Sequence, residues 1–284
     1  MAIISNPIKI AITGGKGGTG KSTVATALSS ILSEDKKVLL IDADVDCPGD
    51  DLLLGIKLKK VEDVKNMMPV FDSKKCIHCG KCAAVCPENA IVFVKDKDPI
   101  FIPEQCIGCR ACKIVCPSGA ITESTQVIGE ISIGQKKNLT LLSGKMKTGI
   151  EESSLVVNAV KKFYEEWEED FDYVIIDTAA GTHCPVIAAL SGSDRALAIT
   201  EPTSLGAHDL DLILSLAKKL KIKTQVVINR ASIGPEGIIE KVIKKYHTKI
   251  IAKIPYSQDI EKKYCSGLPI QNMEIKKIAN QLKK

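Results

Sequence analysis

Short apolar runs alternate with longer amphipathic stretches along most of the chain. The runs are continuous, as is typical of strands buried on both faces of a parallel sheet, and they occupy residues 8–13, 37–42, 172–177, 195–200 and 224–230. Two further short strands are predicted at 127–133 and 139–142, whereas residues 61–75 show no clear period. Helical spacing follows several runs, as at 23–33 and 153–169. This alternation predicts an α/β fold with a doubly wound, mostly parallel sheet.

A glycine-rich stretch, GGKGGTGKS at residues 14–22, directly follows the first run. Counted from Gly15 it fits G-x4-G-K-[ST], the phosphate-binding loop of P-loop NTPases, which joins a strand to a helix. Its glycines let backbone N–H groups face the phosphates, Lys21 would reach the β- and γ-phosphates, and the Ser22 hydroxyl would bind Mg²⁺. A plain glycine-rich turn is the alternative. The residues predicted to bind ATP or ADP are Gly15, Lys16, Gly17, Gly18, Thr19, Gly20, Lys21, Ser22 and Thr23.

Aspartates mark the ends of two apolar runs. Asp42 and Asp44 lie two residues apart, so both point the same way if the strand continues. They lie toward the carboxyl edge of the sheet, where acids beside a triphosphate require a metal ion between them. By its position, Asp177 is the aspartate that binds Mg²⁺ through water. Asp46, in the following loop, is either a third active acid or part of an acidic surface turn.

Composition narrows the class of protein. Of 284 residues, 45% are hydrophobic and 26% are charged, which are globular values. The start of the chain lacks the pattern of a secretion signal, and no apolar run approaches the roughly 20 residues of a membrane span. We therefore expect a cytoplasmic protein without a membrane span. The net charge of +5 comes from scattered lysines, so nucleic-acid binding is not expected.

Eight of the eleven cysteines form two equal runs, C-x2-C-x2-C-x3-C-P, thirty residues apart. In a chain without a secretion signal, such spacing indicates metal chemistry rather than disulfides. It is the pattern of bacterial two-cluster ferredoxins, in which the fourth cysteine of each run binds the other 4Fe–4S cluster. The predicted ligands are Cys76, Cys79, Cys82 and Cys116 for one cluster, and Cys106, Cys109, Cys112 and Cys86 for the other.

Zinc is the alternative for these cysteines, but four-thiolate zinc sites need no third and fourth cysteine at these offsets. His78, between two ligands, is predicted to be a surface residue. We expect two domains: a P-loop ATPase domain from residues 1–70 and 124–284, and an inserted ferredoxin domain from residues 71–123. Basic side chains in the insertion either offset the negative charge of the clusters or attract an acidic redox partner.

Lys16, an extra lysine inside the phosphate loop, carries a resemblance to a known family. Together with the strands that end in Asp42 and Asp177, it makes the chain resemble the deviant P-loop ATPases that include MinD, ParA and the nitrogenase iron protein, here with an inserted ferredoxin domain. The resemblance implies a homodimer across the nucleotide face, in which Lys16 touches the partner's nucleotide. A solvated loop lysine is the alternative. The family usually has Pro-Pro-Gly or Pro-Ala-Gly where this chain has Ala179-Ala180-Gly181.

The same resemblance implies roles for further residues. Asp42 would support the Mg²⁺ site, and Asp44 would orient or activate the attacking water. Asn229 and Pro255 would contact the adenine, because they match the family's base-binding segments. The catalytic residues implied are thus Lys16, Lys21 and Asp44, and the residues expected around Mg²⁺ are Ser22, Asp42 and Asp177.

Three functions are compatible with these motifs. The first is an ATPase that couples MgATP-dependent dimer switching to electron transfer through two 4Fe–4S clusters, with a redox partner protein. The second is a carrier ATPase for iron–sulfur or metal-cofactor assembly, and the third is a positioning ATPase like MinD. A nucleotide sensor without turnover is a further alternative. Cys184 is either a thiol that meets a cluster or sulfur, or a small buried hydrophobe, and Cys47 and Cys265 are expected to be packed.

Overall fold

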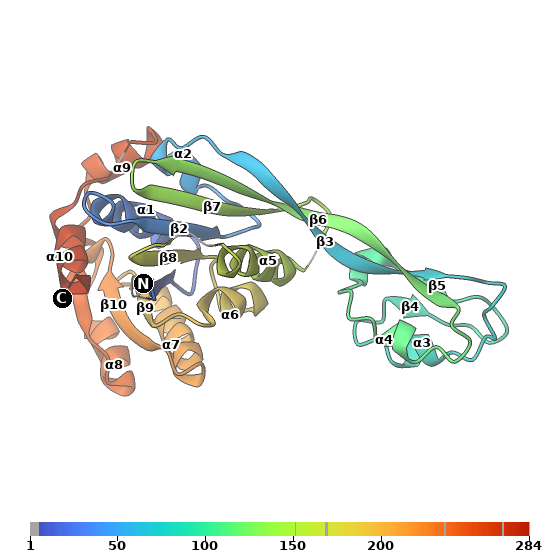
Figure 1. Cartoon of the computed structure of the whole chain (residues 1–284). Coiled ribbons are helices and arrows are strands. Elements are labelled where there is room, and N and C mark those ends of the chain that lie inside the picture. Colours follow the sequence, from blue (N-terminus) through green and yellow to red (C-terminus); the bar gives the residue numbers. More distant parts are fainter. Residues whose placement is uncertain (1–5, 151, 168–169, 236, 269, 284) are drawn as a thin grey trace.

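The computed structural model describes residues 6–150, 152–167, 170–235, 237–268 and 270–283. It has an α/β body, from which a long two-stranded ribbon extends to a small lobe (Figure 1). Residues 1–5 and 284 of the predicted ATPase domain, and the last two residues of the helix predicted at 153–169, lie outside the described residues. No described helix is long and apolar enough to cross a membrane.

The body is built on one large sheet. Within the described residues its strand order is β11-β10-β9-β1-β8-β2-β7-β6-β3. The strands from β11 to β7 are parallel to their neighbours, whereas β6 is antiparallel to both β7 and β3. The prediction of a mostly parallel α/β sheet is therefore confirmed. The parallel strands are β1 (Ile8–Thr13), β2 (Val38–Ala43), β7 (Leu139–Met146), β8 (Tyr173–Thr178), β9 (Arg195–Thr200), β10 (Lys223–Ile228) and β11 (Ile250–Lys253).

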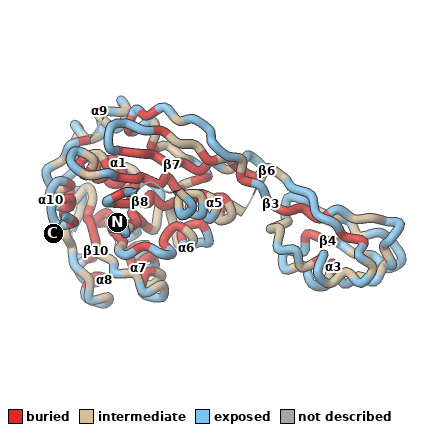
Figure 2. The backbone as a smooth tube through the Cα atoms, viewed as in Figure 1, coloured by how far each residue is buried: buried red, intermediate tan, exposed pale blue. Residues whose placement is uncertain are grey.

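Helices cover both faces of the sheet, which explains the continuous apolar runs. The sheet has two hydrophobic cores, and alternate residues of one strand pack into different ones. In β2, Leu39 and Ile41 lie in the first core, whereas Val38 and Leu40 lie in the second. Figure 2 shows the central strands as the buried layer. The first core includes α5 (Ser153–Glu165), α6 (Cys184–Leu190), α7 (Ser204–Lys219) and α8 (Gly237–Tyr246). The second includes α1 (Lys21–Leu32), α2 (Asp50–Leu54) and α10 (Met273–Leu282), with α9 (Gln258–Cys265) touching it through Ile260.

The ribbon is the main difference from the predicted elements. Residues 61–75, which show no period, lie largely in β3 (Lys59–Phe71), and the strand predicted at 127–133 is part of the longer β6 (Ile121–Lys136). The two strands pair from Lys59 opposite Ile133 to Phe71 opposite Ile121. β3 is an edge strand whose far half leaves the body, and its buried residues, Val64, Met67, Met68 and Pro69, do not alternate with exposed ones as they would in a half-buried strand.

The lobe, which we call the cysteine-rich lobe, comprises residues 72–120 between the ends of the ribbon. Its elements are α3 (Lys81–Ala84), β4 (Ile91–Val92), β5 (Ile100–Phe101), the 3₁₀ turn η1 (Pro103–Gln105) and α4 (Ala111–Ile114), while a second 3₁₀ turn, η2 (Ala231–Ile233), lies in the body. Its buried core is small: Cys82, Ile91 and Cys112, closed by Ile121 of β6. A unit of about 50 residues with so little core normally needs disulfides, metals or cofactors for stability.

Candidate functional site

The glycine-rich loop joins β1 to α1 at the carboxyl edge of the sheet. Gly20 has a φ of 93° and immediately precedes the helix. A Cβ at this position would lie 2.3 Å from the Asn229 amide nitrogen, and a Cβ on Gly15 would lie 2.4 Å from Asp209. The loop therefore requires glycine both for its conformation and for close packing, as in a phosphate-binding loop.

Lys21 is buried at the start of α1, and its Nζ donates a hydrogen bond to the Lys16 carbonyl at 3.2 Å. Burial lowers the pKa of Lys21, while the charges of Asp177 and Asp44 act in the opposite direction. The ammonium group is thus held inside the loop and beside the acids. A triphosphate in the loop would meet a positive charge that is already positioned.

The pairing register of strands β2 and β8 brings two of the predicted aspartates together. Asp42 of β2 lies directly opposite Asp177 of β8 in the parallel ladder. Burial raises the pKa of both carboxyl groups, and their mutual repulsion adds to the effect at Asp177. The Ser22 hydroxyl hydrogen-bonds to Asp177, so the loop and the acids are in direct contact. Asp44 is half-buried at the nucleotide cleft, and Asp46 is exposed.

A cleft of about 360 Å³ opens beside the loop. Gly17, Gly18 and Lys21 line its phosphate side together with Asp44. Asn229 and Pro255, which the family resemblance assigns to adenine, line the same cleft, and Asn229 donates to the Thr19 carbonyl at 2.8 Å. Sequence reasoning missed the contributions of Arg230, Ile260 and Tyr264. Only the tertiary position of α9 brings the last two to the cleft.

Lys16 is held by a buried acid that no sequence motif indicates. Its Nζ lies 3.3 Å from Glu201 Oε2, and Arg230 donates to Glu201 Oε1 at 2.6 Å. Glu201 follows β9 and is buried, with its side chain 6% exposed. Lys16 is therefore paired within its own chain instead of pointing freely into solvent.

Two cavities in the cysteine-rich lobe each bring four cysteines together. Each set takes three cysteines from one run and the fourth from the other: Cys76, Cys79, Cys82 and Cys116 in one cavity, Cys86, Cys106, Cys109 and Cys112 in the other. Among the described residues all cysteines are free thiols. Burial raises the pKa of the Cys82 and Cys112 thiols, so a metal would be needed to hold them as thiolates near neutral pH. Cluster binding here stays a prediction.

The backbone repeats in the two runs even where the residue type does not. Residues at matching positions share a positive φ: His78 (54°) and Gly108 (69°), Gly80 (70°) and Arg110 (65°), and Asn89 (52°) and Gly119 (63°). A non-glycine residue in this region costs on the order of 1 kcal/mol. Both runs adopt this conformation despite its cost. The path of the backbone around each cavity is therefore the same even where the residue types differ.

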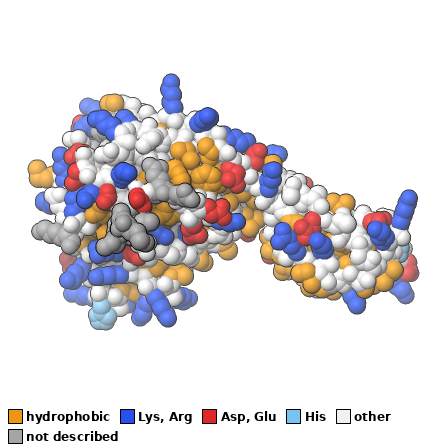
Figure 3. Space-filling view, in the orientation of Figure 1, with side chains coloured by type: hydrophobic (Ala, Val, Ile, Leu, Met, Phe, Trp, Pro, Cys, Tyr) orange, Lys and Arg blue, Asp and Glu red, His pale blue; other side chains and the backbone are white. Residues whose placement is uncertain are grey.

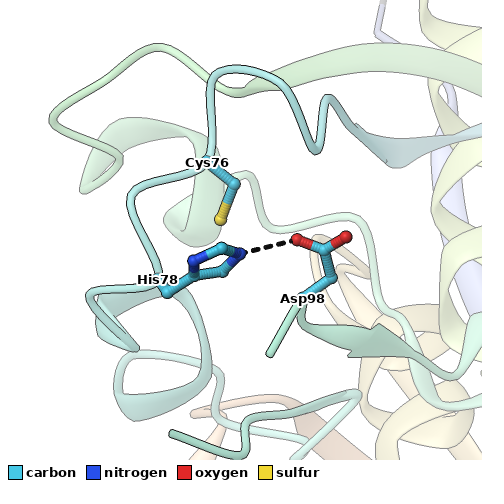
Figure 4. Close-up of side chains that lie close together, drawn as sticks. All are labelled: Cys76, His78 and Asp98. Carbon is cyan, nitrogen blue, oxygen red and sulfur yellow. Dashed lines mark hydrogen bonds and ion pairs between the residues drawn. The ribbon is translucent and has the colours of Figure 1, made fainter. Parts of the chain in front are cut away.

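His78 forms a hydrogen bond with Asp98 beside one of these cavities. Its Nε2 lies 2.8 Å from Asp98 Oδ1, and Figure 4 shows the ring directed at Asp98 with the Cys76 sulfur close by. Both cavities lie against the ribbon. Met67 and Pro69 of β3 line the other cavity, where Asn66 donates to the Cys106 carbonyl at 3.5 Å, whereas Phe71 and Ile121, at the lobe end of the ribbon, line the cavity beside His78.

Three other cysteines are exposed: Cys47, Cys184 and Cys265. The expectation that Cys47 and Cys265 are packed is wrong, as is the interpretation of Cys184 as a buried hydrophobe. Cys47 lies in the loop after Asp44, and Cys265 ends α9, so neither faces a core. Cys184 begins α6, three residues after Gly181, whose N–H donates to the Gly14 carbonyl of the phosphate loop at 3.2 Å.

Comparison with known proteins identifies similar sequences and folds. Residues 10–270 match the family described as the CobQ/CobB/MinD/ParA nucleotide binding domain. An uncharacterized protein of Methanocaldococcus jannaschii is 37% identical over 93% of this chain and 91% of its own length. The cytosolic Fe-S cluster assembly factor Nubp2 homolog of Aedes aegypti is 26% identical over 78% of this chain and 68% of its own. The septum site-determining protein MinD of Pyrococcus horikoshii, solved with Mg-ADP, has a TM-score of 0.61 at 19% identity, covering 98% of this chain and 96% of its own.

Proposed function

This chain belongs to the CobQ/CobB/MinD/ParA nucleotide-binding family, and from that premise we propose that it is an ATPase whose nucleotide state controls electron transfer through two 4Fe–4S clusters. One observation carries the proposal: two four-cysteine cavities lie at the end of a ribbon whose strands continue into the ATPase sheet. β6 of the ribbon pairs with β7, and β7 pairs with β2, the strand that holds Asp42. The lobe is thus joined to the nucleotide edge by continuous backbone hydrogen bonds.

The residues of the lobe fit two cubane clusters. Each cavity presents four thiols and otherwise mainly apolar side chains or backbone. Thiolate ligands suit iron–sulfur clusters, which supply one-electron carriers when bound. Cluster binding would also explain how a lobe with a small core is stable. We propose that this lobe, corresponding to the predicted segment 71–123, is a ferredoxin-type domain inserted into the ATPase domain.

Groups suited to the hydrolysis of ATP to ADP and phosphate lie in the cleft and beside it, which supports this proposal. Ser22, Asp42 and Asp177 would hold Mg²⁺, which neutralises charge on the phosphates when bound. Lys21 places a positive charge in the loop, and Asp44 lies where it can orient a water molecule. Lys16 would add a second positive charge from the partner of a homodimer, and Asn229 and Pro255 would hold the adenine.

Electron transfer needs a partner, and the surface of the lobe favours an acidic one. Its visible face carries Lys and Arg side chains among acidic and hydrophobic ones (Figure 3). The basic residues of this segment are Lys74, Lys75, Lys81, Lys95, Lys97, Arg110 and Lys113. Positive charge around a redox site steers an acidic protein toward it. We propose that a reduced, acidic partner protein supplies the electrons.

Assembly of iron–sulfur clusters is the second candidate, because one relative bears the name of a cytosolic Fe-S cluster assembly factor. Ferredoxin-type ligation by four thiolates holds a cluster firmly, so transfer of the two lobe clusters is disfavoured. The exposed Cys184 near the phosphate loop would support a transferable third cluster in a dimer. A positioning ATPase like MinD would give the eight lobe cysteines no role.

The proposal is tested by measuring iron content and the reduced-state EPR spectrum anaerobically, with and without MgATP. We expect about eight irons per chain and a spectrum that changes with MgATP. A Lys21→Ala variant should keep the iron and lose the change. An unchanged spectrum in a protein that hydrolyses ATP would contradict electron transfer gated by ATP, and iron near zero would remove the ferredoxin assignment.

Glu201 gives a further prediction, since Lys16 must leave Glu201 before it can reach a partner's nucleotide. Glu201→Gln is expected to strengthen dimerisation about thirtyfold with a non-hydrolysable ATP analogue, because two Lys16–Glu201 ion pairs separate in each homodimer and each contributes about 1 kcal/mol. Sedimentation equilibrium measures the dimer, and Glu166→Gln, at an exposed ion pair on α5, is the matched control. Weaker dimerisation than wild type would mean that Glu201 orients Lys16 for the dimer instead.

A further inference from the structure

Three buried carboxyl groups from three elements converge beneath the phosphate loop. Asp42 ends β2, Asp50 begins α2, and Asp177 lies near the end of β8. One carboxylate oxygen from each lies within 4.8 Å of one from each of the others. Each residue is only 1% exposed. Asp50 is not part of any binding motif predicted from the sequence. It also does not line the cleft beside the phosphate loop.

The hydrogen bonds of the three acids differ sharply. Asp42 accepts from the backbone N–H groups of Asp44 at 3.2 Å, Gly49 at 2.9 Å and Asp50 at 3.2 Å. Both carboxylate oxygens of Asp50 and Oδ1 of Asp177, in contrast, are buried and have no hydrogen-bond partner among the described residues. A buried carboxylate without a partner is strongly unfavourable, so these oxygens need either a proton or a cation.

Lys21, the lysine near these acids, does not hydrogen-bond to the carboxylate of Asp50. Lys21 acts on Asp177 and Asp44, and its ammonium donates to the Lys16 carbonyl. The charges with the strongest effects on Asp50 are instead those of other carboxylates, first Asp42 and then Asp177. Three close carboxylates with unpartnered oxygens repel one another unless protons or a cation lie between them.

We propose that Asp42, Asp50 and Asp177 form a binding site for a divalent cation that is occupied in the absence of nucleotide, with Asp50 as a direct ligand. The donor set consists only of carboxylate oxygens, which selects hard cations such as Mg²⁺ and Mn²⁺ over zinc or copper. Asp177 also contacts Ser22, so the bound cation lies directly against the phosphate loop. The site would order the loop before ATP arrives.

Mn²⁺ is the probe for this site. Nucleotide-free holo-protein, stripped with EDTA and desalted, is titrated with Mn²⁺ while room-temperature EPR records the free ion. Wild type is expected to bind one Mn²⁺ per chain, and Asp50→Asn to bind it at least tenfold more weakly. Asp51→Asn, the same charge change at the next residue, should keep wild-type affinity.

Each outcome decides the proposal. No Mn²⁺ binding by wild type without nucleotide would overturn it, whatever the variants do. Equal affinity in Asp50→Asn would remove Asp50 as a ligand and overturn it as well. A loss of affinity in Asp51→Asn as large as in Asp50→Asn would mean that general charge sets the affinity, and would overturn it too. Thermal unfolding in EDTA shows whether Asp50→Asn folds. None of these results depends on ATP hydrolysis or on the clusters, so they leave the proposed function to its own test.

Discussion

Replacing Lys21 by alanine is expected to lower kcat for ATP hydrolysis by about 10²- to 10³-fold, the range found when one preorganised charge-stabilising group is removed from an active site. The side chain is buried inside the loop, and the other basic side chains that the described part of the chain places at the loop, those of Lys16 and Arg230, are already paired. Lys16 pairs with Glu201, and Arg230 pairs with the same carboxylate. Phosphate release under anaerobic conditions measures the effect.

The control is Lys219→Ala, an exposed lysine at the end of α7 far along the chain from the loop. It should keep the wild-type rate. Lys16→Ala should also lose activity if hydrolysis takes place in the dimer. Wild-type turnover in Lys21→Ala would mean that this loop is not the site of hydrolysis.

The second large effect is expected in the cysteine-rich lobe, where Cys116→Ala should lower the iron content from about eight to about four per chain. Cys116 lies in the second run, but its thiol shares a cavity with Cys76, Cys79 and Cys82. Loss of one thiolate leaves that cluster without its fourth ligand, while the other cavity keeps all four. Iron and sulfide analysis together with reduced-state EPR counts the remaining clusters.

Double variants test the crossed arrangement directly. Cys79→Ala with Cys116→Ala removes two cysteines of one cavity and should still leave about four irons. Cys79→Ala with Cys86→Ala removes one from each cavity and should leave almost none. The opposite result would mean that each run holds its own cluster. Cys265→Ala, at an exposed cysteine on α9, should keep all the iron.

The sequence alone was sufficient to predict the elements that depend on only a few neighbouring residues. The phosphate loop needs glycines at set positions between a strand and a helix, and the structure has the loop between β1 and α1. The buried runs of β1, β2, β8 and β9 are continuous because both faces of the sheet are covered, so their pattern could be recognised. β3 could not be recognised, because its partner β6 lies fifty or more residues away in the chain and its buried residues do not alternate with exposed ones.

The sequence by itself determined the α/β class, the phosphate loop and the spacing of the cysteine runs, because each of these depends on backbone conformation over a few residues. Tertiary structure decided the rest. It placed Asp50 against Asp42 and Asp177, Glu201 against Lys16, and Tyr264 at the cleft. It also set the lobe at the end of a ribbon. These contacts join residues that are distant in the chain, and they follow from strand order and helix packing, which no local pattern encodes.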